Sequence, residues 1–283
     1  MSWLKKRKKV AIQNADSDSG NVEKEMSFVE HLEELRWHLI RSLIAIVIFA
    51  VLAFVFRQFV FDFIIFGPRH DDFPTYRFFC MLSDATCFTP EKFEIKPIQM
   101  GEEFFTAIKV AFWMGFIASF PYLFYEFWRF IKPGLYEKES KAAKGIVLSC
   151  SLLFITGVSF GYFIIAPFAI NFLIGFDVGA MVSTAPTLSS YVNYMTLFTI
   201  PTGILFQLPI FVYFFSIIGL LTPAVMKKYR KHAFIVILII AAIATPPDVV
   251  TQFLVGVPVY ILYEFSILIS ARASKKYQAS LKE

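Results

Sequence analysis

Long runs of apolar residues, separated by short polar stretches, make up most of the chain. A helix that crosses the ~30 Å hydrocarbon core of a bilayer needs ~20 apolar residues at a rise of ~1.5 Å each. Six runs reach or approach this length, at residues 37–57, 104–128, 145–168, 191–219, 233–245 and 251–270. The pattern predicts an all-α membrane protein with six transmembrane helices. Only 13 residues separate His232 from Pro246, so the fifth helix is predicted to be short.

The polar stretches outline the domain organisation. Residues 1–26 are polar and charged, which predicts a flexible tail. Order is expected from Ser27, because Ser27 and Glu30 fit a capping box at the start of a helix. A single membrane domain is predicted over residues 27–270, with an enlarged loop at about 58–103 and a C-terminal tail at 271–283.

Composition and charge agree with this class. The chain is 57% hydrophobic and 17% charged, which is more apolar surface than a soluble domain of this size can bury. Lys and Arg concentrate on alternate loops, with twenty-one on one predicted side and five on the other, excluding Lys109 within a span. By the positive-inside rule both termini are predicted to be cytoplasmic. The net charge of +5 is therefore interpreted as a topology signal and not as a nucleic-acid site.

Cysteine and histidine residues predict no metal site and no cofactor, because three Cys and four His are few and scattered. Cys80 and Cys87 fall in the predicted outer loop, where an oxidising compartment favours a disulfide. Two separate thiols are an equally open alternative. Cys150, in the third span, is interpreted as a small packing residue.

Two other function classes have some support. Gly157–Gly161 matches the G-x-S-x-G pattern of serine hydrolases, but it lies inside an apolar helix and also reads as G-x-x-x-G, which favours close helix packing. A small-solute transporter is the second alternative, motivated by six spans and by ionisable groups within them. Glu126 and Glu264 are expected to reach polar surroundings at helix ends, and Lys109 is expected to extend outward.

Carboxylates gather at the predicted cytoplasmic edge, and two interpretations of them stay open. Three precede or enter the first span and two lie in the loop between the second and third spans: Glu30, Glu33, Glu34, Glu137 and Glu139. They are either ordinary solvated charges or an acidic site for a cationic ligand. A carboxylate suits a guanidinium group, since the two form paired hydrogen bonds.

Four segments together resemble the TatC family. Residues 30–36 (EHLEELR) resemble the signature that opens these proteins, and residues 127–139 (FWRFIKPGLYEKE) resemble the first cytoplasmic loop. Residues 205–209 (LFQLP) and 245–248 (TPPD), the latter with Gln252, match in the same order. The resemblance implies short fifth and sixth helices and a concave bundle in a bacterial cytoplasmic (inner) membrane.

The resemblance also implies a function and a set of site residues. A TatC protein recognises twin-arginine signal peptides at the cytoplasmic face and assembles with TatA and TatB, for export of folded proteins driven by the proton-motive force. Self-association and lipid contacts are also expected. The implied residues are Glu34 and Glu139 on the arginines, Arg36 and Phe130 shaping that site, Gln207 in an intramembrane pocket for a partner, and Asp248 and Gln252 at the outer hairpin.

Two residues depart from the family pattern, and two others have a structural role as an alternative. His38 stands where the signature often has a second Arg, and Gln207 replaces the Glu of some members. Asp248 has a helix-capping role as an open alternative, and Phe130 a role as an interfacial anchor.

Overall fold

The computed structural model describes residues 28–82, 87–90, 93–132, 145–176, 185–244 and 249–280. The chain divides into two compact units, Met1–Ile40 and Arg41–Glu283, which are called here the N-terminal unit and the large unit. The predicted tail at 1–26 and the capping box at Ser27 lie outside the described residues, as does the boundary between residues 26 and 27.

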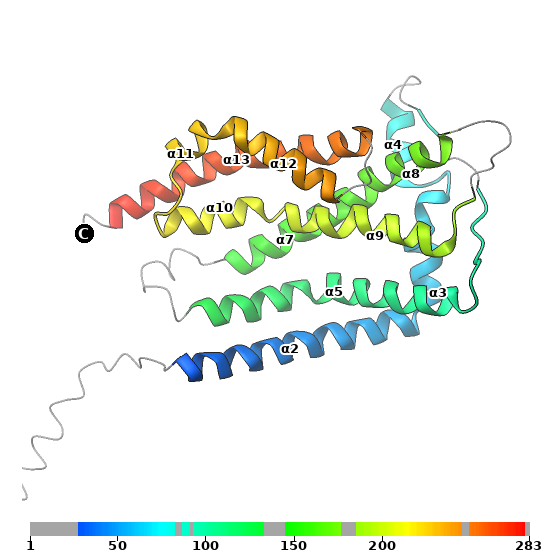
Figure 1. Ribbon diagram of the computed structural model, residues 1–283, viewed down its shortest axis with the longest axis horizontal. Helices are drawn as coiled ribbons and strands as arrows, with labels where there is room; N and C mark the ends of the chain where they lie inside the picture. Colours follow the sequence, from blue (N-terminus) through cyan, green and yellow to red (C-terminus); the bar gives the residue numbers. More distant parts are fainter. Residues whose placement is uncertain are drawn as a thin grey trace, which may run out of the picture. The chain divides into compact units, whose positions relative to one another are not determined.

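Helices account for nearly all of the described chain, and the described residues contain no β-strand beyond an isolated bridge between Lys96 and Thr187. The all-α class is confirmed. In chain order (Figure 1) the elements are α2 Phe28–Val55, α3 Arg57–Phe59, the π-helical η1 Val60–Ile65, the 3-10 turn η2 Gly67–Arg69, α4 Pro74–Leu82, α5 Glu102–Ile131, α7 Ile146–Phe160, the π-helical η4 Gly161–Ile165, α8 Ala166–Gly175, α9 Leu188–Leu205, α10 Leu208–Ile217, α11 Pro223–Lys228, α12 Arg230–Ala244 and α13 Val249–Ser280.

Five helical segments in the described chain are long and apolar enough to cross a membrane: Leu32–Val55, Glu102–Ile131, Ile146–Gly175, Leu188–Ile217 and Thr251–Lys275. The predicted fifth span lies in α12, which has 15 residues and is therefore ~22 Å long. This helix is shorter than the hydrocarbon core, as the sequence predicts, and it is not one of the five.

The prediction of a short sixth helix is wrong. Helix α13 has 32 residues and continues to Ser280, through much of the stretch predicted to be a tail. The physical reason is local: residues 271–280 contain no Pro or Gly, and most of them favour helix, so nothing stops the helix where the apolar run ends.

The predicted outer loop is more ordered than the sequence suggests, because helical turns continue from α2 through η1. Cys80, in α4, forms a disulfide with Cys87, so the bonded alternative is the one that the structure has. The Tyr76 hydroxyl donates to the Pro68 carbonyl at 2.8 Å and accepts from Asn171 of α8 at 3.0 Å. Burial raises the pKa of Tyr76 to about 12. These contacts fix α4 against α8.

Small residues let helices of the large unit approach closely. A Cβ atom added to Gly157 would lie 2.9 Å from the Cα of Gly203, and one added to Gly161 would lie 2.5 Å from the carbonyl oxygen of Phe198. Helix α7 and the following η4 therefore pack against α9 through the G-x-x-x-G face, which confirms the packing interpretation of this motif. Gly115 of α5 faces the backbone of Ala50 in α2 at a similarly short distance.

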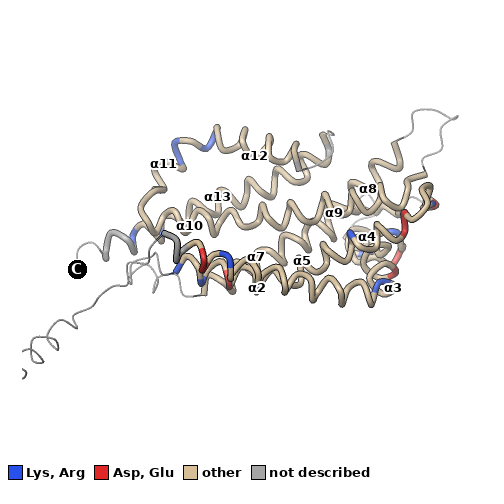
Figure 2. Tube along the Cα trace, turned by 60° about the horizontal axis from the view of Figure 1, so that its bottom comes forward, with Lys and Arg blue, Asp and Glu red and all other residues tan. Residues whose placement is uncertain are grey.

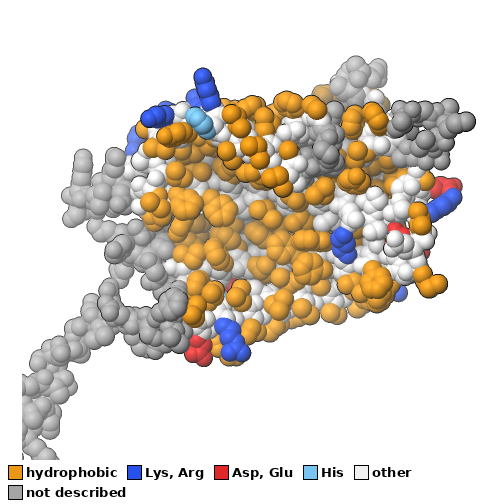
Figure 3. Space-filling model, in the orientation of Figure 1, with side chains coloured by type: hydrophobic (Ala, Val, Ile, Leu, Met, Phe, Trp, Pro, Cys, Tyr) orange, Lys and Arg blue, Asp and Glu red, His pale blue; other side chains and the backbone are white. Residues whose placement is uncertain are grey.

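Apolar side chains are both the core and much of the surface. Phe154, Phe198 and Ile165 are fully buried between α7, η4 and α9. Many large apolar side chains are more than half exposed, such as Val47, Val51, Ile235, Ile243 and Ile261. Figure 3 shows a face on which hydrophobic side chains are spread over the helices. An apolar surface of this extent requires a hydrocarbon solvent.

Candidate functional site

Charged residues within the described ranges occur mostly near helix ends, and the middle parts of the long helices contain few of them (Figure 2). This distribution is expected in a membrane, where a charge at the centre of the bilayer costs at least ~2.5 kcal/mol. The candidate chemistry is therefore found at these ends, and it begins with the carboxylates.

Glu34, in the N-terminal unit, is incompletely satisfied. It lies one turn before His38 on α2, and its Oε1 atom is 3.9 Å from His38 Nε2. The side chain is 39% exposed, yet Oε2 is buried and has no hydrogen-bond donor among the residues that the structure describes. A buried acceptor without a donor costs about 1 to 3 kcal/mol, and more when it is charged. Glu34 thus retains capacity for a cationic donor.

The other residues predicted for the arginine site are only partly described. Arg36 is exposed on α2, and Phe130 is half-buried near the end of α5. Glu137 and Glu139 lie outside the described residues. Their contacts with Glu34 therefore stay a prediction.

Glu126 of α5 is buried, with 2% of its surface exposed. The expectation that its side chain reaches open polar surroundings is therefore wrong. The Tyr122 hydroxyl, one turn earlier, donates to its Oε1 at 2.7 Å. The Arg41 guanidinium, in the large unit, lies 3.8 Å from its Oε2. Sequence reasoning missed this pair because Arg41 and Glu126 are on different helices. The sequence does contain a signal for the contact within α5, because Tyr122 and Glu126 have the i, i+4 spacing that places two side chains next to each other on a helix.

Gln207 lies at the break between α9 and α10, and its amide faces α7. The Cys150 thiol donates to its Oε1 at 2.8 Å, and its Nε2 donates to the Cys150 carbonyl at 3.1 Å. Gln207 is 6% exposed and Cys150 is 1% exposed. Both ends of the amide are thus used within the protein, which joins α7 to the break in the fourth span. Contact of Gln207 with a partner stays a prediction.

At the hairpin of α12 and α13, Gln252 is half-buried and Asp248 lies outside the described residues. The Gln252 Nε2 atom donates to the Leu238 carbonyl at 3.1 Å. This bond joins the first turn of α13 to the middle of α12. It is a structural contact within the hairpin.

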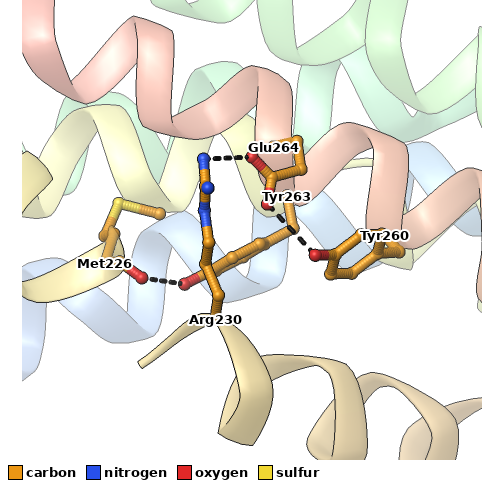
Figure 4. A network of polar contacts seen from close by, with 5 residues as sticks. All are labelled: Met226, Arg230, Tyr260, Tyr263 and Glu264. Atoms are coloured by element: carbon orange, nitrogen blue, oxygen red, sulfur yellow. Dashed lines mark hydrogen bonds and ion pairs between the residues drawn. The ribbon is translucent and has the colours of Figure 1, made fainter. Parts of the chain in front are cut away.

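A polar network holds the other end of this hairpin (Figure 4). Arg230, the first residue of α12, donates to Glu264 of α13 at 2.7 Å, and the Tyr260 hydroxyl donates to the same carboxylate at 3.1 Å. The Tyr263 hydroxyl donates to the Met226 carbonyl of α11 at 2.9 Å. Glu264 is 33% exposed at its side chain, which agrees with the expected polar surroundings.

Glu102 is a carboxylate that sequence reasoning did not select. It is the first residue of α5 and is buried, and it accepts hydrogen bonds from three backbone N–H groups: those of Ile98 at 2.7 Å, Gln99 at 3.2 Å and Ser189 at 2.7 Å. The contact from Ser189 joins the starts of α5 and α9. Two acidic residues after Gly101 are a local signal for the start of a helix, but no local signal points to the donor from Ser189, which is 87 residues away.

No group of three or more His, Cys, Asp or Glu residues within the described ranges is placed to hold a metal ion. The hydroxyl of Ser159, the nucleophile of the hydrolase alternative, lies in the helical segment that packs on α9. This setting is the wrong backbone for a nucleophile elbow, which needs a strand-to-helix turn.

Comparison with known proteins gives consistent similarities. A family model described as Sec-independent protein translocase protein (TatC) matches residues 30–258. A protein named Sec-independent protein translocase protein TatC from Blattabacterium sp. subsp. Periplaneta americana is 42% identical over 90% of this chain and 99% of its own length. A protein of the same name from Desulforapulum autotrophicum is 36% identical over 92% and 90%. A crystal structure of the twin arginine translocase receptor TatC matches with a TM-score of 0.68 at 34% identity, over 87% of this chain and all of that one.

Proposed function

The chain belongs to the TatC family of Sec-independent protein translocase proteins, and from this premise we propose that it binds the paired arginines of twin-arginine signal peptides through Glu34 and Glu139. The family makes the chain a multi-pass membrane protein and a component of a protein translocase, which is a transport protein and not an enzyme. The peptide and the residues that hold it are the proposal.

The state of Glu34 supports the proposal most directly. Its Oε2 atom is buried without a hydrogen-bond donor among the described residues, while part of the side chain stays exposed. An arginine guanidinium supplies parallel N–H donors with the geometry that a carboxylate needs. Binding would then supply a donor that the described residues do not give to this oxygen, and the peptide would gain affinity from the new bond.

Arg36 and Phe130 complete the proposed peptide site. Phe130 offers an apolar ring to the hydrophobic part of a signal peptide, and exposed Arg36 offers hydrogen-bond donors to its backbone or acidic groups. The site is proposed to face the cytoplasm, together with both termini, because most Lys and Arg lie on the loops of that side.

We further propose assembly with the single-span subunits TatA and TatB in a bacterial inner membrane. Residues proposed to contact the partners are Gln207, in the fourth span, and Asp248 and Gln252, at the hairpin of α12 and α13. Several copies are proposed to associate in the complex, with lipid around them. Export of folded proteins would draw on the proton-motive force.

Photo-crosslinking of a twin-arginine precursor tests the peptide site. The double variant Glu34→Gln, Glu139→Gln keeps side-chain size and removes both negative charges, so capture by full-length protein in membranes is expected to fall about tenfold or more. A precursor with Lys-Lys in place of Arg-Arg is expected to lose capture by the unchanged protein, because an ammonium lacks the paired donors.

The matched control is Glu33→Gln, which removes a neighbouring exposed charge from the same helix. It is expected to capture the precursor nearly as well as the unchanged protein. Undiminished capture by the double variant would remove Glu34 and Glu139 from the site, and equal losses in the control would reduce the effect to general surface charge.

A further inference from the structure

Lys109 is a charge on the membrane-facing part of the large unit that the proposed function does not use. It is exposed on α5, and its ammonium donates a hydrogen bond to the side-chain oxygen of Asn193, which is exposed on α9. Both residues lie inside helical segments that are long and apolar enough to cross a membrane. An exposed cation at such a place is costly unless it meets a polar or anionic group.

The depth of this pair follows from the helices themselves. The contact of Ser189 N–H with Glu102 places these two residues at the same level, at the starts of α9 and α5. Lys109 is then ~10 Å along α5 from that level, and Asn193 only ~6 Å along α9. Because Lys109 reaches Asn193, its ammonium extends back toward the helix starts by about one turn. This direction leads to the zone of lipid headgroups.

An apolar groove follows the pair along the same two helices, because its lining includes Val110, the residue after Lys109 on α5, and Thr196, about one turn after Asn193 on α9. Its cavity of about 230 Å³ is lined by Trp113 and Met114 from α5, Thr196 and Thr199 from α9, and Tyr162 and Phe163 from the segment after α7. The hydroxyls of Thr196 and Thr199 donate to the carbonyls one turn earlier on their own helix. The Tyr162 hydroxyl donates to the Ile64 carbonyl at 2.6 Å, so three of the polar side chains that line the groove are already hydrogen-bonded within the protein. Ser159 and Trp113 also line the groove, and its remaining side chains are apolar, which suits a hydrocarbon chain.

We propose that Lys109 and this groove form a binding site for one phospholipid. The ammonium of Lys109 binds the phosphate, the side-chain amide of Asn193 keeps the ammonium in position, and one acyl chain occupies the groove beyond it. The cation lies nearer the headgroup zone and the apolar groove lies deeper, which is the order in which a lipid presents its phosphate and its acyl chain. This order favours a lipid over the acidic residue of a partner helix. No role in signal-peptide recognition is required.

Native mass spectrometry of the purified full-length protein with added phosphatidylglycerol tests the site. Lys109→Gln is expected to lower the occupancy of the tightest bound phosphatidylglycerol about tenfold, because it removes the charge but not the stem. Lys109→Arg keeps the charge and is expected to retain the lipid. Thr196→Trp, which fills the groove while the charge remains, is expected to lower the occupancy as well.

Two controls separate this site from general lipid attraction. Arg57→Gln removes another exposed cation, from the wall of the hollow that Glu102 also lines, and is expected to leave occupancy unchanged. Diacylglycerol with the same chains lacks the phosphate and is expected to bind weakly to every variant. Phosphatidylglycerol bound equally by the protein with and without Lys109, or diacylglycerol bound as tightly as phosphatidylglycerol, overturns the proposal.

A protein occupant would give a different pattern. Loss of a co-purifying single-span subunit from Lys109→Gln, with lipid occupancy unchanged, would assign the surface to that subunit and reject the lipid. Capture of a twin-arginine precursor is expected to be unaffected by Lys109→Gln, so failure of the lipid site and failure of the peptide site are distinguishable.

Discussion

The carboxylate at the start of α5 and the one in the first part of α2 show two opposite states of the same chemical group. Glu102 accepts from three backbone N–H groups, two from the preceding turn and one from the start of α9. Glu34 has one oxygen 3.9 Å from His38 and one buried oxygen without a described donor. Both residues are Glu near a span, so residue type and position do not distinguish them. The number of hydrogen-bond donors that each carboxylate has within the protein does distinguish them. A carboxylate with all its donors has a structural role, and one that lacks a donor has the capacity to bind a ligand.

Glu264 is an intermediate case. Its carboxylate is satisfied by side chains, Arg230 and Tyr260, and it remains 33% exposed at its side chain. Side-chain partners move more freely than backbone N–H groups and compete with water. The three residues therefore form a series in which the cost of removing the charge should fall from Glu102 to Glu264 to Glu34.

The largest effect is expected for Glu102→Ala. This change leaves three backbone N–H groups without their acceptor, so the free energy of unfolding should fall by about 3 kcal/mol or more. Thermal unfolding in detergent, followed by circular dichroism, measures the loss. Glu103→Ala is the control, because Glu103 is exposed on the next position of α5, and it should change stability by less than about 0.5 kcal/mol. Equal effects of the two variants would break the comparison.

A smaller effect is expected for the pair of Arg230 and Glu264. Because both side chains are partly exposed, the coupling energy between Arg230→Gln and Glu264→Gln should be about 1 kcal/mol or less. A double-mutant cycle on thermal unfolding measures it. A coupling of about 3 kcal/mol would mean that this pair holds the hairpin of α11, α12 and α13 as firmly as backbone donors hold Glu102.

The smallest effect on stability is expected for Glu34→Gln. Since one oxygen has no described donor and the other only a distant His38, loss of the charge should change the free energy of unfolding by less than about 0.5 kcal/mol, or raise it. The same unfolding measurement checks this value. A loss as large as that of Glu102→Ala would show that Glu34 is a structural residue.

The sequence was sufficient for the features that depend on local pattern. Apolar run lengths predicted the five long spans and the short α12, and the spacing of Gly157 and Gly161 predicted a packing face. It failed at the end of α13, because apolarity marks where a span ends and not where a helix ends. The apolar run ends at residue 270, but the polar residues that follow it favour helix, so α13 continues beyond it.

The site was less predictable, because its contacts join distant parts of the chain. Ser189 donates a hydrogen bond to Glu102, Arg41 lies close to Glu126, and Cys150 is hydrogen-bonded to Gln207. No rule of sequence spacing links such pairs. The disulfide of Cys80 and Cys87 was undecided for a different reason, since a separation of seven residues permits a bond without requiring one. The family resemblance indicated which residues to consider for the site. Their burial and hydrogen bonds came only from the structure.

A double-mutant cycle on peptide affinity tests the central claim most directly. The Kd of a fluorescent signal peptide is measured with unchanged protein and with Glu34→Gln, each against peptides that carry Arg-Arg or Gln-Gln. If Glu34 binds the arginines, the coupling energy between the two changes should be about 1.5 kcal/mol or more, because either change alone already removes the charge-assisted bond. Losses that add to within about 0.3 kcal/mol would show that Glu34 and the arginines do not meet.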